Sequence, residues 1–132
     1  MEKTRVAYRV PYADTDKMGV VYYANYLVYF ERVRNEMLRE SGLSYLDMEI
    51  QGVILPVVEV SCIYKSPALY DDVLEIFGWF DEITTARIKI NCEIIRNSKL
   101  LTSGYTIHAC LSAKTRKPIR IPQGVKECLS LK

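Results

Sequence analysis

Residues Tyr12–Arg39 read YADTDKMGVVYYANYLVYFERVRNEMLR, and this stretch decides the fold. It opens with two acids, Asp14 and Asp16, and passes through Gly19 into a run of apolar residues. No proline or glycine interrupts Val20–Ser41, so the sequence predicts one helix of about 30 Å. The first three turns are apolar on almost every side, and a helix of that kind is buried all round. We therefore expect other elements to wrap it.

Five other stretches are predicted to be strands, because they are rich in β-branched and aromatic residues and are separated by turn signals. In the fourth of them polar and apolar residues alternate, as expected of a strand with one buried face. The third is apolar on both faces, so we expect the helix to cover one face and another subunit the other. The five stretches are Arg5–Tyr12, Leu55–Ser66, Asp72–Phe80, Arg87–Arg96 and Leu100–Ala113.

Short connections between the later strands predict antiparallel hairpins. A short helical turn is expected at Leu43–Ile50, with Ser44 as its N-cap, and another at Gln123–Leu129. The sequence thus predicts an α+β fold, with an antiparallel sheet of about five strands around one long central helix. We expect residues 1–132 to form a single domain.

Net charge, the lengths of the apolar runs and the spacing of the cysteines argue against several classes of function. The net charge of +2 over 132 residues gives no reason to expect binding to nucleic acid. The N-terminus has no apolar signal segment, and no apolar run approaches the length of a membrane span, so we expect a cytoplasmic protein without membrane insertion. The cysteines form no close pairs, which predicts reduced core residues and no metal site. They are Cys62, Cys92, Cys110 and Cys128.

The acids before the predicted helix are the candidate site. Asp16 would lie just ahead of a helix N-terminus, where backbone N–H groups are unpaired and the dipole is positive. A carboxylate beside free N–H groups in an apolar cleft suits acyl transfer, because the N–H groups can hold a developing oxyanion. The alternative interpretation is that Asp16 only caps the helix.

The same residues resemble a family signature. The pattern D-x-D-x-x-G-[VI]-V-[YWF]-[YH]-x-x-Y, typical of the 4-hydroxybenzoyl-CoA thioesterase group, begins at Asp14 and ends at Tyr26. The following FERVRNEML and the later Ala113–Pro118 are similar to the Tol-Pal-associated branch of that group. The resemblance implies a hotdog fold and hydrolysis of an acyl-CoA thioester, without metal or bound cofactor.

The resemblance also implies roles for individual residues. Asp16 falls on the catalytic carboxylate, which acts as nucleophile or general base on the thioester carbonyl. Tyr23 falls where a backbone N–H polarises the thioester oxygen, and Gly19 where substrate approaches the backbone closely. Each site of the family is built at a dimer interface, and dimers often pair again, so we expect a homodimer that assembles into a homotetramer.

CoA is anionic, so its phosphates need cations or N–H groups. The segment Lys114–Arg120 has four basic residues in seven and is the strongest candidate. The same cluster would suit an acidic acyl carrier protein, which is an alternative source of the thioester. The candidate substrate-binding residues are Tyr22, Lys65, Thr84, Thr85, Arg87, Lys114, Arg116 and Lys117.

A second class of function is an acyl-CoA, acyl-carrier or lipid-binding module that hydrolyses nothing. The intact spacing of Asp16, Gly19 and Tyr23 favours the enzyme. His108, the only histidine, is expected to serve a local hydrogen-bond network in a strand. Hotdog dehydratases resemble this architecture but have a catalytic histidine at the helix region. No histidine lies near the predicted helix start here, so the resemblance disfavours dehydration chemistry.

Overall fold

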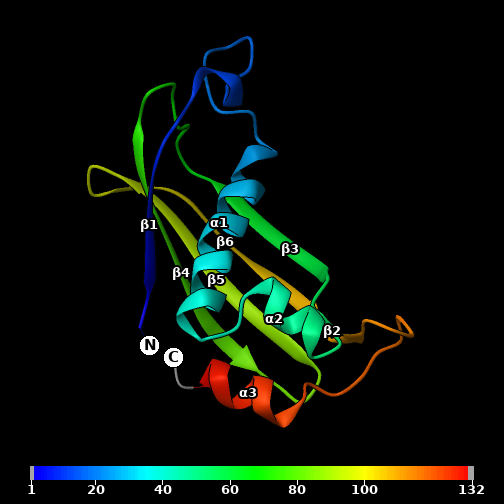
Figure 1. The fold of residues 1–132 in the computed structure, drawn as a ribbon. Helices are drawn as coiled ribbons and strands as arrows, with labels where there is room; N and C mark the ends of the chain where they lie inside the picture. Colours follow the sequence, from blue (N-terminus) through cyan, green and yellow to red (C-terminus); the bar gives the residue numbers. More distant parts are fainter. Residues whose placement is uncertain (1, 131–132) are drawn as a thin grey trace.

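The computed structural model describes residues 2–130. Its main sheet has five antiparallel strands in the order β1-β4-β5-β6-β3, and a separate two-stranded sheet pairs β2 with β7. Figure 1 shows the sheet lying behind the long helix α1. The strands are β1 (Thr4–Arg9), β2 (Val53–Ile54), β3 (Val57–Tyr64), β4 (Val73–Ile83), β5 (Arg87–Arg96), β6 (Lys99–Ala109) and β7 (Leu111–Ser112).

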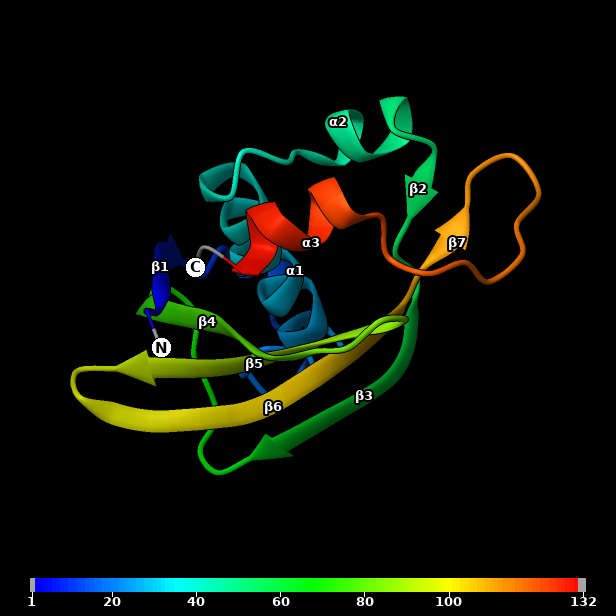
Figure 2. The same ribbon diagram turned by 90° about the horizontal axis from the view of Figure 1, so that it is seen from below.

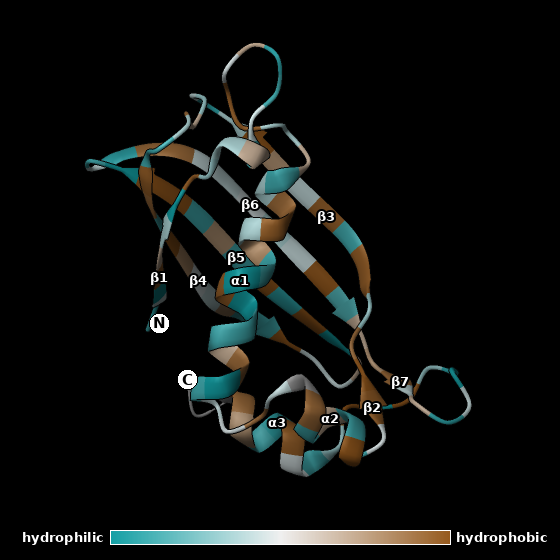
Figure 3. Ribbon diagram, turned by 45° about the horizontal axis from the view of Figure 1, so that its top comes forward, coloured by the Kyte–Doolittle hydropathy of each residue, from teal (hydrophilic) through white to brown (hydrophobic). Residues whose placement is uncertain are grey.

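The predicted strands are confirmed in their order along the chain, with shifts at their ends. The predicted hairpins are confirmed for β4–β5 and β5–β6, but β3 pairs with β6 and not with β4, the next strand in the sequence. Strand β5 has the predicted bounds, and its residues alternate between buried and more exposed positions. Figure 3 shows the same alternation as brown and paler bands along the main sheet. The last predicted strand is divided into β6 and β7, and β2 was not predicted. Two-residue strands such as β2 and β7 are too short to produce a sequence period.

Helix α1 (Asn25–Glu40) packs directly on the sheet, which curves around it in Figure 2. Two strand glycines permit this approach. A Cβ on Gly78 would lie 2.8 Å from the sulfur of Met37, and one on Gly104 would lie 2.9 Å from the ring of Phe30. The phenylalanine ring is fully buried. The helix therefore lies closer to the sheet than side chains at those two positions would allow.

The predicted helix start is wrong, because α1 begins at Asn25 and not at Val20. Val20 and Val21 are in extended backbone instead, where they bridge Leu69 and Thr15. The N–H of Val21 also donates to the carbonyl of Ala68 at 2.9 Å. Tertiary pairing thus overrides a local sequence that contains no helix-breaking residue, and β-branched valines tolerate the extended backbone well.

The expectation that the early turns of α1 are wrapped on all sides is also wrong for the single chain. Leu27 and Val28 are 38% and 49% exposed. The sheet covers one side of the helix only, so the buried residues form a stripe. They are Tyr26, Tyr29, Phe30, Val33, Arg34, Met37 and Leu38.

The short helices agree with the sequence. Helix α2 (Tyr45–Ile50) begins with a capping box in which the hydroxyl of Ser44 accepts from the N–H of Asp47, and the Asp47 carboxylate accepts from the N–H of Ser44. Helix α3 (Gln123–Ser130) covers the predicted helical turn near the C-terminus. Figure 2 shows α2, α3, β2 and β7 gathered at one end of the main sheet.

The expectations that the cysteines are unpaired and that Glu31 forms an ion pair on its own helix are confirmed among residues 2–130. All four cysteines are free, and burial raises the pKa of the Cys92 thiol to about 12. Glu31 pairs with Arg34 at 3.7 Å, one helical turn away. Within these residues no group of His, Cys, Asp or Glu side chains is placed to hold a metal ion, and no helix is long and apolar enough to cross a membrane.

His108 serves the local network that the sequence predicts, and it makes stability depend on pH. The ring is buried, with Nε2 2.9 Å from the Thr106 hydroxyl and Nδ1 2.9 Å from the carbonyl of Leu55. Burial lowers its pKa from 6.5 to about 4. Between these pH values the imidazole of His108 is protonated in the unfolded chain and neutral in the folded chain. The free energy of unfolding therefore decreases as pH drops from 6.5 towards 4.

We expect His108 to contribute up to about 1.4 kcal/mol of this loss for each pH unit within that window. Urea unfolding between pH 7 and pH 4.5 measures it. The variant His108→Gln keeps hydrogen-bonding groups but does not titrate, so its profile should be flatter than that of the wild type. If the free energy of unfolding depends on pH equally in the variant and in the wild type, the pH dependence does not come from His108.

Candidate active site

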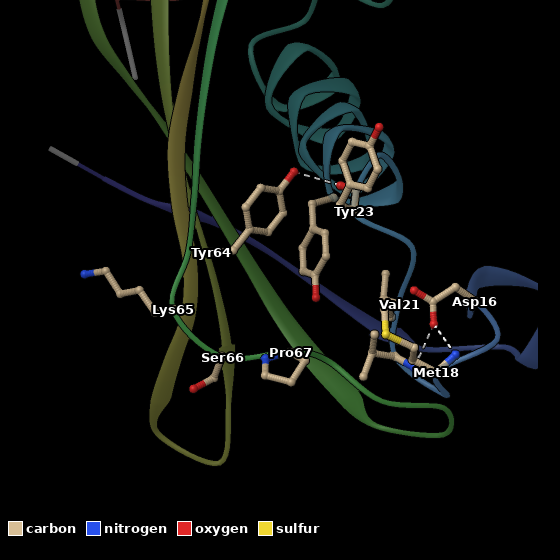
Figure 4. Close-up of a pocket in the computed structure, with 10 residues that line it drawn as sticks. Asp16, Met18, Val21, Tyr23, Tyr64, Lys65, Ser66 and Pro67 are labelled. Atoms are coloured by element: carbon tan, nitrogen blue, oxygen red, sulfur yellow. Dashed lines mark hydrogen bonds between the residues drawn. The ribbon is translucent and has the colours of Figure 1, made fainter.

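A cavity of about 320 Å³ lies where the loop before α1 meets the end of β3. Its size is within the range of small-ligand sites. Most of its walls are apolar or aromatic, and Figure 4 shows their arrangement. The lining residues are Asp16, Met18, Val20, Val21, Tyr23, Tyr26, Tyr64, Lys65, Ser66 and Pro67.

Asp16 is half-buried in the wall of this cavity and is held by a tight turn. Its Oδ1 accepts from the N–H of Met18 at 2.8 Å and from the N–H of Val20 at 3.4 Å. Among the described residues Oδ2 accepts no hydrogen bond, and in Figure 4 it points away from the turn. One carboxylate oxygen is thus fixed by the backbone, while the other is available to a ligand.

The turn requires a glycine for its conformation. Gly19 has a φ of +80°, and a Cβ there would meet no atom within 4 Å. The requirement is therefore the left-handed backbone and not a lack of space. Asp16 stabilises this turn and lies nine residues before Asn25, where α1 begins, so the expectation that Asp16 immediately precedes the helix is wrong.

The N-terminus of α1 still contributes to the cavity through Tyr23. Its N–H donates to no acceptor within residues 2–130, whereas the neighbouring N–H of Tyr22 donates to the carbonyl of Asp14 at 2.9 Å. Ala24, the N-cap, provides no side-chain acceptor either. The carbonyl of Tyr23 accepts from the hydroxyl of Tyr64 at 2.8 Å, which fixes the peptide against β3. The cavity is therefore lined by one residue with a free backbone N–H and by another with a free carboxylate oxygen, the two kinds of group that an oxyanion site combines.

Aromatic side chains form the rest of the wall. The buried hydroxyl of Tyr26 accepts from the N–H of Ala68 at 3.0 Å, and its ring packs edge-on against Tyr64. Burial raises the pKa of both phenols, so both remain protonated at neutral pH. The segment after β3 is held by Arg96, which donates to Asp72 at 2.6 Å and to the carbonyl of Pro67 at 3.3 Å. The wall opposite Asp16 is thus tied to both the helix and the sheet.

The structure brings together only part of the predicted site. Asp16, Tyr23 and Lys65 line one cavity, and Gly19 lies in the turn that forms its edge. Tyr22 is 46% exposed and is not in the lining, although its ring packs on that of Tyr23 at 4.7 Å. The structure therefore brings the first four residues together around one cavity and leaves Tyr22 outside its lining.

The remaining candidates lie at the other end of the main sheet (Figure 1). Thr84 and Arg87 line a separate hollow of about 180 Å³ at the turn between β4 and β5. The carbonyl of Thr85 accepts from the N–H of Ile121 in the segment that follows the basic cluster. The basic candidates in the exposed loop after β7 do not reach the cavity within one chain. They are Lys114, Arg116 and Lys117.

Several lining residues were not predicted. Tyr64, Ser66 and Pro67 approach Asp16 only because β3 lies on the edge of the main sheet beside the N-terminus of α1. Their sequence signal, a strand that ends in Ser-Pro, indicates a turn but not its neighbours. Met18, whose side chain is 80% exposed, gives no signal at all.

Comparisons with known proteins give a consistent result. The model of the thioesterase-like superfamily matches residues 10–129. The chain is 34% identical to the acyl-CoA thioesterase YbgC of Haemophilus influenzae over 119 residues, which cover 89% of this chain and 88% of that protein. The crystal structure of the DHNA-CoA thioesterase from Staphylococcus aureus superposes with a TM-score of 0.93 at 33% identity, over 99% of this chain and 91% of that one. Protein TT1821 from Thermus thermophilus gives a TM-score of 0.92 at 32% identity, over 98% and 97% of the two chains.

Proposed function

Because this chain belongs to the thioesterase-like superfamily and is a thioester hydrolase with the hotdog fold, we propose that it hydrolyses acyl-CoA through Asp16. The observation that carries the proposal is that Asp16, with a free carboxylate oxygen, and Tyr23, with a free backbone N–H, line the same cavity. The similarity to the Haemophilus influenzae acyl-CoA thioesterase supports CoA as the thiol.

The chemistry follows from these two groups. The N–H of Tyr23 polarises the thioester carbonyl and stabilises the negative charge that develops on its oxygen. The carboxylate of Asp16 adds to the carbonyl carbon, or takes a proton from a water that does so. Collapse of the adduct breaks the carbon–sulfur bond and releases the CoA thiolate. On the first route water then cleaves the acyl–Asp16 anhydride, so both routes yield a free acid and CoA.

The test is thiol release from short, long and aromatic acyl-CoAs, with acyl carrier protein thioesters beside them. We expect release from at least one CoA ester, with one acid formed for each thiol. The aromatic wall of Tyr23, Tyr26 and Tyr64 accommodates both aliphatic and aromatic acyl groups. Binding of every CoA ester without thiol release would favour the binding-module alternative.

We further propose that the site is completed by a second copy of the chain, paired along β3. This strand is one of the two edges of the main sheet, β1 being the other, and an open edge with apolar side chains favours association. Val57 and Val60 on β3 line a mostly apolar groove of about 300 Å³ with Leu27 and Val28 of α1. A second β3 lying antiparallel across this edge would cover the groove.

Antiparallel pairing of two β3 strands would also explain why the candidate CoA-binding residues in the basic loop after β7 and in the β4–β5 turn lie away from the cavity within one chain. Strand β3 runs from the end of the sheet that carries the basic loop to the end that carries the cavity. A twofold axis across β3 would therefore bring the basic loop of one copy to the cavity of the other. The basic loop and the β4–β5 turn would then supply cations and hydroxyl groups for CoA. Half-exposed Phe77 and Trp79 on the outer face of the sheet would suit a further pairing into tetramers.

We expect Val60→Lys to separate the copies, because it places a charge in an apolar interface. Sedimentation velocity should show a dimer or tetramer for the wild type and a monomer for the variant, and turnover should fall by about tenfold or more if the partner holds CoA. Ile50→Lys is the control, since Ile50 is an apolar residue 76% exposed on α2, away from β3 and from the outer face that carries Phe77 and Trp79. A monomeric and fully active wild type would contradict the proposal.

A further inference from the structure

The first acid of the motif, Asp14, does not line the cavity, but its side chain joins two distant elements. Its Oδ2 accepts from the hydroxyl of Tyr8 on β1 at 2.7 Å and from the hydroxyl of Tyr29 on α1 at 2.7 Å. The two rings pack together with centroids 4.9 Å apart. Asp14 therefore connects the edge strand of the main sheet to the second turn of the central helix.

The main chain of Asp14 makes a second pair of connections. Its carbonyl accepts from the N–H of Tyr22 at 2.9 Å and from the side-chain amide of Asn25 at 2.9 Å. Asn25 is the first residue of α1, so this carbonyl is attached to the helix start. Asp14 thus receives four hydrogen bonds from four residues that span the N-terminal quarter of the chain.

These bonds connect the two groups that are proposed to carry out the chemistry. Asp16 follows Asp14 by two residues, and the N–H of Tyr23 belongs to the residue after Tyr22. We propose that Asp14 is a positioning residue that sets the Asp16 carboxylate against the Tyr23 N–H. The inference rests on the proposed function, because it concerns the geometry of that same site.

The surroundings of Asp14 keep both phenols in their hydrogen-bonding form. Burial is the main cause that raises the pKa of Tyr8 and of Tyr29, and the hydrogen bond to Asp14 raises it further. Both hydroxyls therefore remain donors at neutral pH. Tyr29 is 1% exposed, and the guanidinium of Arg32 lies 4.3 Å from the centroid of the Tyr8 ring. The Tyr29 ring is thus enclosed by the core, and the Tyr8 ring lies between Tyr29 and Arg32 beside Asp14.

Loss of the hydrogen bonds to Asp14 should affect the rate of the reaction more than the binding of substrate. A displacement of about 1 Å in a reacting group can cost on the order of a hundredfold in rate, without weakening the binding of substrate. Loss of the bonds to Asp14 would loosen the relative position of Asp16 and Tyr23, but it removes no wall of the cavity. The effect should therefore fall on kcat and leave KM almost unchanged.

The experiment compares Tyr8→Phe, Tyr29→Phe and the double variant with Tyr105→Phe. Tyr105 is the matched control, since its hydroxyl also donates to a carboxylate at 2.7 Å, that of Glu59, on the exposed face of the sheet. We expect kcat to fall about tenfold or more in the double variant, with KM within about twofold of the wild type. The Tyr105 variant should match the wild type in both constants. All rates are compared well below the melting temperature of each variant.

Two variants of Asp14 separate positioning from simple stabilisation. Asp14→Asn retains one oxygen that can accept a phenol, whereas Asp14→Ala retains none, so kcat should decrease from wild type to Asn to Ala. Unchanged kcat in folded Ala and double-phenylalanine variants, with Asp16-dependent turnover intact, would overturn the positioning role alone. A wild type that hydrolyses no thioester would overturn the proposed function, and this inference with it.

Discussion

We expect the replacement of Asp16 with asparagine to lower kcat for an acyl-CoA by about a thousandfold, which corresponds to roughly 4 kcal/mol of transition-state stabilisation. The amide keeps the shape of the side chain, and its oxygen can still accept the N–H groups of Met18 and Val20. What disappears is the second carboxylate oxygen, which could attack the thioester or activate water. The measurement is steady-state thiol release beside a thermal unfolding curve.

The matched control for that variant is Asp71→Asn. Asp71 is an aspartate in an exposed loop, where it pairs with Arg9 at 3.3 Å, and it does not line the cavity. Its φ of +70° is one that asparagine tolerates. We expect its kcat to remain within about twofold of the wild type, because no group near the thioester changes. Near-normal turnover in Asp16→Asn would remove Asp16 from the mechanism.

The largest expected effect on stability comes from Phe30→Ala. Phe30 is fully buried between α1 and the main sheet, and its ring occupies the space that Gly104 leaves open. Truncation removes most of that contact and leaves a cavity, which typically costs about 3–5 kcal/mol. Urea unfolding measures the loss as a lower midpoint with little change in slope.

The control for the core variant is Leu46→Ala on α2. Leu46 is 65% exposed, so its truncation removes few buried contacts. The free energy of unfolding should change by less than about 1 kcal/mol. Equal effects of the two substitutions would mean that α1 does not lie on the sheet as described. A small effect of Phe30→Ala alone would mean that the core collapses into the space left by the ring.

Much of the fold could be predicted because its signals are periodic and local. The alternation in Arg87–Arg96 predicted a strand with one buried face, and β5 has those bounds. The capping residues Ser44 and Asp47 predicted the start of α2 for the same reason, since a cap acts within one helical turn. The start of α1 could not be predicted, because the bridge of Val20 to Leu69 depends on a partner far along the chain.

The candidate site was predictable where one continuous segment builds it. Asp16, Gly19 and Tyr23 lie within eight residues, and the motif that contains them could be read directly from the sequence. The opposite wall comes from Tyr64 and the residues after it, which only the sheet order brings near. The basic cluster was chosen by its charge alone, and charge does not tell at which end of the sheet a loop lies. Within one chain this loop and the segment before α1 lie at opposite ends of the main sheet (Figure 1).

The thioester is proposed to react between Asp16 and the N–H of Tyr23. A crystal structure of the Asp16→Asn variant with an intact acyl-CoA would locate the thioester, because we expect the substitution to slow turnover and to preserve the cavity. We expect the thioester oxygen within hydrogen-bond distance of the Tyr23 nitrogen, with its carbon facing residue 16. An acyl group bound elsewhere, with this cavity empty, would overturn the proposed mechanism.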